Sequence, residues 1–100
     1  MRRLFLVFAQ HQGGWDWSKD MRGQERWDEH ARFMDDLVDT GVVVLGGPLD
    51  EREVVLAVEA ESETWIRARL AADPWIEMGI LGISAIRPWT VLLDGTRPDA

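Results

Sequence analysis

The sequence predicts an α+β domain in which a four-stranded antiparallel sheet carries two main helices on one face. Two observations lead to this class. Four short stretches are mostly apolar, as strands buried within a sheet are. Between them, two longer stretches repeat apolar residues at intervals of three and four, as on one side of a helix. The 100 residues suffice for one domain with one core, so we expect a single domain over 1–100.

The chain begins with a predicted strand and a long loop. Leu4–Ala9 is apolar at every position, which is typical of a strand buried on both faces. Residues 10–23 then carry three glycines, no periodicity and two tryptophans, Trp15 and Trp17. A loop of this length in a small domain usually has a function. We expect both indoles to fold over a site as a lid that contacts the substrate.

The first helix is predicted over Gln24–Gly41, where Gly41 can take the left-handed conformation that ends a helix. Its apolar residues share one side of that helix: Trp27, Ala31, Met34, Leu37 and Val38. His30 follows Trp27 by three residues and falls on the same side. An imidazole directed inward needs a hydrogen-bond partner or a function.

The middle of the chain is predicted to form two strands joined by a turn. Val42–Leu45 is the second strand, and the proline of Gly46–Pro48, which cannot donate to a strand ladder, is expected to end it. Leu49–Glu53 carries four charged residues and is predicted as the turn. Val54–Val58 is the third strand.

A second helix follows these strands. Ser62 is a suitable N-cap for it, with acidic residues around its start. We expect the helix to end at Ala72, because Asp73 precedes a proline and is disfavoured in helical conformation. Pro74 then begins a short helical turn of its own.

The last predicted strand, Ile80–Trp89, completes the order strand, helix, strand, strand, helix, strand. With right-handed crossovers this order gives the ferredoxin-like βαββαβ arrangement, with both helices on one face. The central strands are apolar on both sides, so the other face would be an apolar surface that soluble monomers seldom expose. We therefore expect a homodimer in which a second copy covers the open sheet face. Residues 90–100 would form a C-terminal arm, whose apolar piece Val91–Leu93 pairs with the partner.

Composition excludes several functional classes. The formal net charge is −7 and no basic run exceeds two residues, which argues against nucleic acid or an anionic membrane surface as partner. The chain has no cysteine and two histidines, so thiol catalysis is excluded and we expect no metal and no cofactor. The first apolar run is too short for a signal sequence and no stretch is long enough to span a bilayer, so we expect a cytoplasmic protein.

His30 and Asp73 are the leading candidates for catalysis. A histidine acting as general acid or base must be held in one tautomer, and a carboxylate on its second ring nitrogen does this. Two helices side by side on a sheet allow the inner face of the first to approach the end of the second, where Asp73 lies. The alternative is structural: His30 is a core histidine bonded to a backbone carbonyl, and Asp73 only caps the turn begun by Pro74.

The order and spacing of five motifs resemble the YCII-related domain family. The motifs are His30, Gly41, Gly46-Gly47-Pro48, Asp73-Pro74 and Pro88-Trp89, and the resemblance as a whole runs from Leu4 to Trp89. The resemblance implies a small dimeric α/β barrel built on a ferredoxin-like unit. It also implies that a His–Asp pair, here His30 and Asp73, lies in a pocket lined by Gly47 and Pro48. One characterised member of that family eliminates chloride from a hydroxyquinol, although the Trp15–Trp17 loop and the compact turn after Pro48 depart from the family pattern.

Two further residues could contact substrate. His11 lies just after the first strand, where it could act as a second acid or base or could be a solvated loop residue. Arg26 precedes His30 by four residues and could neutralise a substrate carboxylate or enolate. The alternative for Arg26 is a surface ion pair with Glu29 or Asp73.

These residues predict a cofactor-independent enzyme of the lyase, isomerase or dehydrochlorinase type. It would act on a small cyclic or aromatic substrate, with His30 moving a proton and Asp73 orienting the ring. Two alternatives remain open from the sequence: a homodimer that binds a small ligand or assists a pathway enzyme without turnover, and a purely structural domain.

Overall fold

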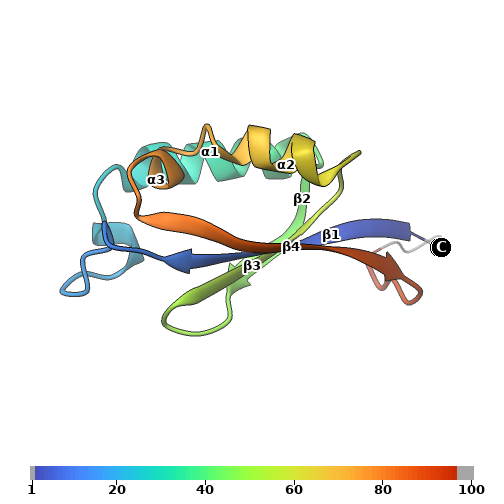
Figure 1. Cartoon of the computed structure of the whole chain (residues 1–100), viewed down its shortest axis with the longest axis horizontal. Helices are drawn as coiled ribbons and strands as arrows, with labels where there is room; N and C mark the ends of the chain where they lie inside the picture. The colour runs from blue at the N-terminus through green and yellow to red at the C-terminus, as the bar shows by residue number, and fades with distance from the viewer. Residues whose placement is uncertain (1, 97–100) are drawn as a thin grey trace.

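The computed structural model describes residues 2–96 and has the predicted ferredoxin-like architecture (Figure 1). The four strands are antiparallel and lie in the order β2-β3-β1-β4. Their bounds are β1 Arg2–His11, β2 Val43–Pro48, β3 Glu53–Val58 and β4 Leu81–Val91. The helices are α1 Trp27–Asp39, α2 Glu63–Leu70 and the one-turn α3 Pro74–Glu77, with a 3₁₀ turn at Met21–Gly23. All three α-helices cover the same face of the sheet (Figure 1).

Helix α1 is shorter than the apolar pattern indicated. It begins at Trp27 because Arg26, its N-cap, has a φ of 59°, in the left-handed region that an α-helix does not continue through. It ends at Asp39, and Gly41 has the predicted positive φ, 81°. Val42 donates its backbone N–H to the carbonyl of Leu37, which closes the helix end.

The strands, in contrast, are longer than predicted. Gly46 and Gly47 do not close the strand but continue the β2 ladder opposite Leu56 and Val55 of β3, and β2 ends at Pro48, as the proline predicted. Proline is tolerated there because it is the last residue of an edge strand.

The predicted C-terminal arm begins later than expected. Thr90 and Val91 belong to β4 and pair with Arg3 and Arg2 of β1, so they are part of the sheet of their own chain. This corrects the prediction for the start of residues 90–100. Leu92 and Leu93 are exposed, and residues 97–100 of the arm lie outside the described residues.

The core between helices and sheet has two parts. The larger one gathers buried side chains from α1, α2 and all four strands, including Val7, Leu37, Val58, Ile66 and Ile86. The smaller one joins Ala9, Trp75, Ile80 and Leu81, with Trp15 and Trp27 packed against it. This second cluster lies at the α3 end of the molecule, away from the last described residues of the chain (Figure 1).

In residues 2–96, no helix covers the other face of the sheet (Figure 1). Leu4, Ala57 and Val91 are buried there, while Leu45 and Trp89 are 61% and 42% exposed. A cavity of about 200 Å³ opens at this face between the sheet and the turn after β4, with Arg2 and Asp94 in its lining. Within residues 2–96, no helix has the length and apolar character needed to cross a bilayer.

Candidate active site

Helices α1 and α3 bring His30 and Asp73 into direct contact. The His30 Nδ1 lies 2.9 Å from Oδ1 of Asp73 and 3.0 Å from Oδ2. His30 is the fourth residue of α1, and Asp73 is the N-cap of α3. Their side chains are only 11% and 3% exposed. A buried carboxylate therefore holds one nitrogen of a nearly buried imidazole.

The position of Asp73 follows from the local sequence. Its backbone N–H donates to the carbonyl of Leu70, which terminates α2, and Pro74 then starts α3 at the first helical position. The Asp73 Oδ1 accepts the backbone N–H of Trp75 at 3.0 Å. The carboxylate thus acts as a helix cap and as the partner of His30 at the same time, so these two interpretations of Asp73 do not compete.

The hydrogen-bond pattern determines which ring nitrogen is available. A carboxylate only accepts hydrogen bonds, so Nδ1 of His30 carries a hydrogen and donates it. Among residues 2–96, Nε2 has no hydrogen-bond partner, and it is not one of the unpaired atoms shut off from solvent. In the neutral ring this nitrogen presents a lone pair to whatever approaches from solvent.

Trp75 determines the plane of the imidazole. The two rings stack with centroids 3.8 Å apart and planes 3° apart, and Trp75 is 2% exposed. The indole Nε1 donates to the backbone carbonyl of Glu25 at 2.8 Å. Trp27 approaches the same imidazole at a tilt, with centroids 5.9 Å apart. Because indole covers one face of His30, a substrate must meet the ring at its Nε2 edge.

The end of β1 and the loop after it add two more rings to those around His30. His11 stacks on Trp15 with centroids 3.6 Å apart, and Trp15 packs edge-on against Trp75. The row His11, Trp15, Trp75, His30 is therefore continuous. Burial lowers the pKa of His11 below its ordinary value of 6.5, and its Nδ1 donates to the carbonyl of Glu51.

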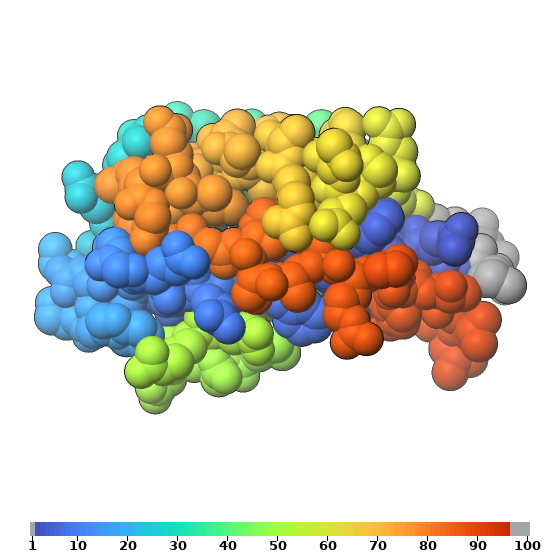
Figure 2. Space-filling model, viewed as in Figure 1, coloured from blue at the N-terminus to red at the C-terminus, as the bar shows by residue number. Residues whose placement is uncertain are grey.

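The two loop tryptophans differ in their positions. Trp15 is half-buried and reaches the second core cluster through Trp75. Trp17 is 54% exposed and lies under the guanidinium of Arg52, 5.1 Å from the ring centroid. The loop packs directly below α3 at this end of the molecule (Figure 2), where Gly14 donates its N–H to the carbonyl of Gly79.

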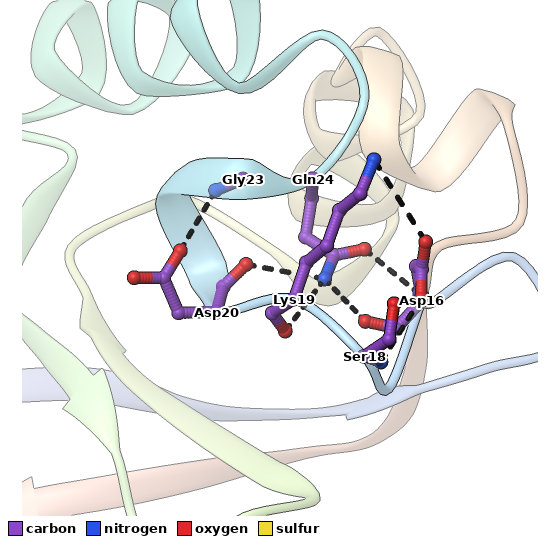
Figure 3. Close-up of polar contacts among 6 residues, drawn as sticks. All are labelled: Asp16, Ser18, Lys19, Asp20, Gly23 and Gln24. Atoms are coloured by element: carbon purple, nitrogen blue, oxygen red, sulfur yellow. Dashed lines mark hydrogen bonds and ion pairs between the residues drawn. The ribbon is translucent and has the colours of Figure 1, made fainter.

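Sequence reasoning missed Gln24, which organises this loop (Figure 3). Gln24 is 4% exposed, and its side-chain amide bonds both backbone groups of Asp16. Gln24 was predicted as the first residue of the helix, and a polar residue at a helix start carries no signal that distinguishes a buried side chain from an exposed one.

The other predicted site residues lie elsewhere. Arg26 pairs with Glu29, as the structural alternative held, and the bond raises the pKa of the guanidinium. Gly47 and Pro48 are on the edge strand β2, opposite Val55 and Val54 of β3. In the described part of the chain, no hydrogen bond or ion pair links Arg26, Gly47 or Pro48 side chains to the His30–Asp73 pair.

Residues 2–96 hold no group of three or more histidine, aspartate or glutamate side chains arranged to bind a metal ion. The cavity of about 200 Å³ is lined by residues of the open sheet face and does not include His30 or Asp73. Because Asp73 holds Nδ1 of His30 and Nε2 has no hydrogen-bond partner in residues 2–96, the imidazole can exchange a proton at Nε2. Asp73 then stabilises the charged ring.

Comparison with known proteins supports the fold. The sequence matches no family model and no curated protein. A similar solved structure is 5-chloro-2-hydroxyhydroquinone dehydrochlorinase from Burkholderia phenoliruptrix AC1100 in complex with 2,5-dihydroxybenzoquinone. The TM-score is 0.56 and the sequence identity is 22%, over 89% of this chain and 93% of that chain. At this identity the likeness shows a shared fold, the predicted ferredoxin-like arrangement of one chain.

Proposed function

We propose that this chain is a small acid–base enzyme of the lyase type, with His30 as its proton-transferring group and Asp73 as the residue that orients it. One observation carries the proposal: Nδ1 of His30 is held by both carboxylate oxygens of Asp73, while Nε2 has no partner in residues 2–96. This is the geometry that a general base needs, with one nitrogen fixed and the other free.

The reaction we propose is elimination of a hydrogen halide from a small hydroxylated ring. Nε2 takes a proton from the substrate, the electron pair left behind forms a new double bond, and the halide leaves with the bonding pair of the broken carbon–halogen bond. The imidazolium then returns its proton to solvent, and Asp73 stabilises that charged ring meanwhile. No net oxidation or reduction occurs, so the step needs no redox cofactor.

Two observations indicate the substrate class. The rings around His30 offer flat apolar surfaces, on which an aromatic or quinonoid substrate could stack. The dehydrochlorinase that shares the fold acts on a chlorinated hydroxyhydroquinone, so this compound class is the first to test. Membership of the YCII-related family is part of the same proposal.

The test compares chloride release by the wild-type protein and three variants, using 5-chloro-2-hydroxyhydroquinone and related halogenated hydroquinones. His30→Gln and Asp73→Asn should each lower the rate by about 10²- to 10⁴-fold, the usual contribution of a positioned base. Asp35→Asn is the matched control, because Asp35 is an exposed acid of α1. Full activity in His30→Gln, with released chloride measured by ion chromatography, would overturn the proposal.

A second candidate is a ligand-binding protein without turnover. The observation that favours it is the cover over the His30 ring, which is 11% exposed and stacked on buried Trp75. This function predicts saturable binding of the same compounds, read from quenching of tryptophan fluorescence, with no product by mass spectrometry.

We also infer that a second copy covers the open face of the sheet. Leu45 and Trp89 are large apolar side chains exposed on that face, beside a buried apolar cluster. Light scattering at micromolar concentration should give the mass of a dimer. The variant Leu45→Glu should shift the mass toward the monomer, and a monomeric wild-type protein would refute this inference.

A further inference from the structure

We propose that Gln24 is a positioning residue for His30, acting through the loop of residues 15–25 and the indole of Trp75. The proposal rests on the proposed function, in which His30 transfers the proton. It assigns a task to the one buried polar side chain of the described loop that has no contact with the catalytic pair.

The first step is the amide of Gln24, which bonds the loop from inside (Figure 3). Its Oε1 accepts the backbone N–H of Asp16 at 2.8 Å, and its Nε2 donates to the Asp16 carbonyl at the same distance. The Nε2 also donates to the carbonyls of Lys19 and Asp20, each at 3.2 Å. A buried amide with this many partners holds the two ends of the loop at a fixed separation.

Residues at both ends of the loop contact the indole of Trp75. Trp15 directly precedes Asp16 and packs edge-on against Trp75, with centroids 5.6 Å apart and planes at 88°. Glu25 directly follows Gln24, and its carbonyl accepts the Trp75 Nε1–H at 2.8 Å. A shift of either end therefore moves a contact of Trp75.

The indole in turn determines the direction of Nε2. The bond to Asp73 holds Nδ1 of His30 but leaves the ring free to swing about that bond. The stack on Trp75, with planes 3° apart, removes that freedom. A misplacement of about 1 Å in a reacting group can cost on the order of 10²-fold in rate. Loss of the Gln24 contacts should therefore reduce turnover without removing the base.

The test uses NMR on the ligand-free protein, so that it does not depend on knowing the substrate. Gln24→Ala removes the amide, and Gln24→Glu places a second acceptor oxygen against three carbonyls. Gln10→Ala is the matched control, because Gln10 is exposed on β1 and has no side-chain hydrogen bond in residues 2–96. The signals are the indole N–H of Trp75 and the ring nitrogens of His30, assigned with Trp75→Phe and His30→Gln.

In both Gln24 variants we expect hydrogen exchange at the Trp75 indole to accelerate about tenfold or more, as it does when a buried hydrogen bond loosens. The Nε2 chemical shift of His30 should change in both variants. Trp75→Phe keeps a stacked ring but loses the bond to Glu25, so its effect on His30 should overlap with that of Gln24→Ala rather than add to it. Backbone amide signals of the sheet serve to verify the fold, and if Gln24→Ala does not fold, the comparison of Gln24→Glu with Trp75→Phe decides.

The results distinguish this proposal from the proposed function. If His30 and Trp75 signals in the folded variants match those of Gln10→Ala, or if Trp75→Phe leaves the His30 signals unchanged, Gln24 does not position His30. If they change but His30→Gln retains full activity, the positioning stands and the catalytic role of His30 is wrong. In an active enzyme, Gln24→Ala should lower kcat about tenfold, and the changed chemical shifts of the His30 ring nitrogens should be seen in the same sample.

Discussion

Replacing Asp73 by alanine removes two interactions with a single change. The Asp73 side chain is buried, and its Oδ1 caps α3 by accepting the Trp75 N–H at 3.0 Å. The same carboxylate accepts the Nδ1–H of His30 at 2.9 Å. Alanine at this position leaves both donors without an acceptor in a part of the protein that is closed to solvent.

The magnitude follows from these two losses. Removing an N-cap acceptor costs about 0.5–2 kcal/mol. Leaving a buried donor such as the His30 Nδ1–H unpaired costs about 1–3 kcal/mol more. We expect Asp73→Ala to lower the free energy of unfolding by about 2–4 kcal/mol, against a total of roughly 5–15 kcal/mol for a domain of this size. The melting temperature should fall by roughly 10 °C or more.

The assay is urea unfolding followed by far-UV circular dichroism at a fixed protein concentration, since association would shift the midpoint. Asp35→Ala on the exposed side of α1 is the control and should stay within about 0.5 kcal/mol of wild type. An Asp73→Ala variant as stable as this control would mean that the carboxylate holds neither the cap nor the imidazole. The buried bonds at His30 would then not be as described.

Three further outcomes can be checked by unfolding measurements. Burial lowers the pKa of His11, so on acidification the unfolded chain binds a proton at this residue before the folded chain does. The free energy of unfolding should therefore fall as the pH drops below 6.5. His11→Gln should flatten this part of the plot of unfolding free energy against pH. Hydrogen bonds, led by that from Thr96, lower the pKa of Asp94 from 3.8 to about 2. The stability that ionised Asp94 contributes is therefore lost as the pH falls between these two values. Asp94→Asn should remove this pH dependence. Gly79 has a φ of 74°, so Gly79→Ala should lower the free energy of unfolding, measured in urea, by about 1–2 kcal/mol. Gly13 has open space around it and no positive φ, so Gly13→Ala should lower this free energy by less than half as much.

The order of the elements was predictable because it depends on local patterns. Apolar runs and helical spacing place His30 on the inner side of α1 without any knowledge of the fold. Ser62 and Asp73 cap their helices as the residue types indicate, by accepting the N–H groups of Trp65 and Trp75. Proximity along the chain is sufficient for each of these features.

The environment of His30 was not predictable in the same way. Trp75 could be expected in the core, yet its stack on an imidazole 45 residues earlier in the chain depends on how α1 and α3 cross the sheet. The bond from Trp75 to the carbonyl of Glu25 spans 50 residues and uses a backbone group, so no residue type signals it. Arg26 in a left-handed conformation shortened α1, because the backbone turns where the loop meets the helix.

The strand ends were missed for a related reason. Gly46–Pro48 has the composition of a turn, but its pairing with β3 depends on the partner strand being present. The same holds for Val91, which is the end of a strand only because Arg2 lies opposite. Strand pairing is a property of two segments, and a single segment does not report it.

The fold and the proposed catalytic geometry depend on the same short helix. A helix of four residues has no stability of its own, so α3 exists because of its cap and its packing. Asp73 supplies the cap, and Trp75 supplies the packing, so the two contacts of His30 come from the residues that hold α3 together. Asp73→Asn separates the two effects: its amide oxygen can still accept from Trp75, but its NH₂ would face Nδ1 across the 3.0 Å now spanned by Oδ2. The ring would then favour the tautomer with its hydrogen on Nε2, so this variant should fold and lack a base.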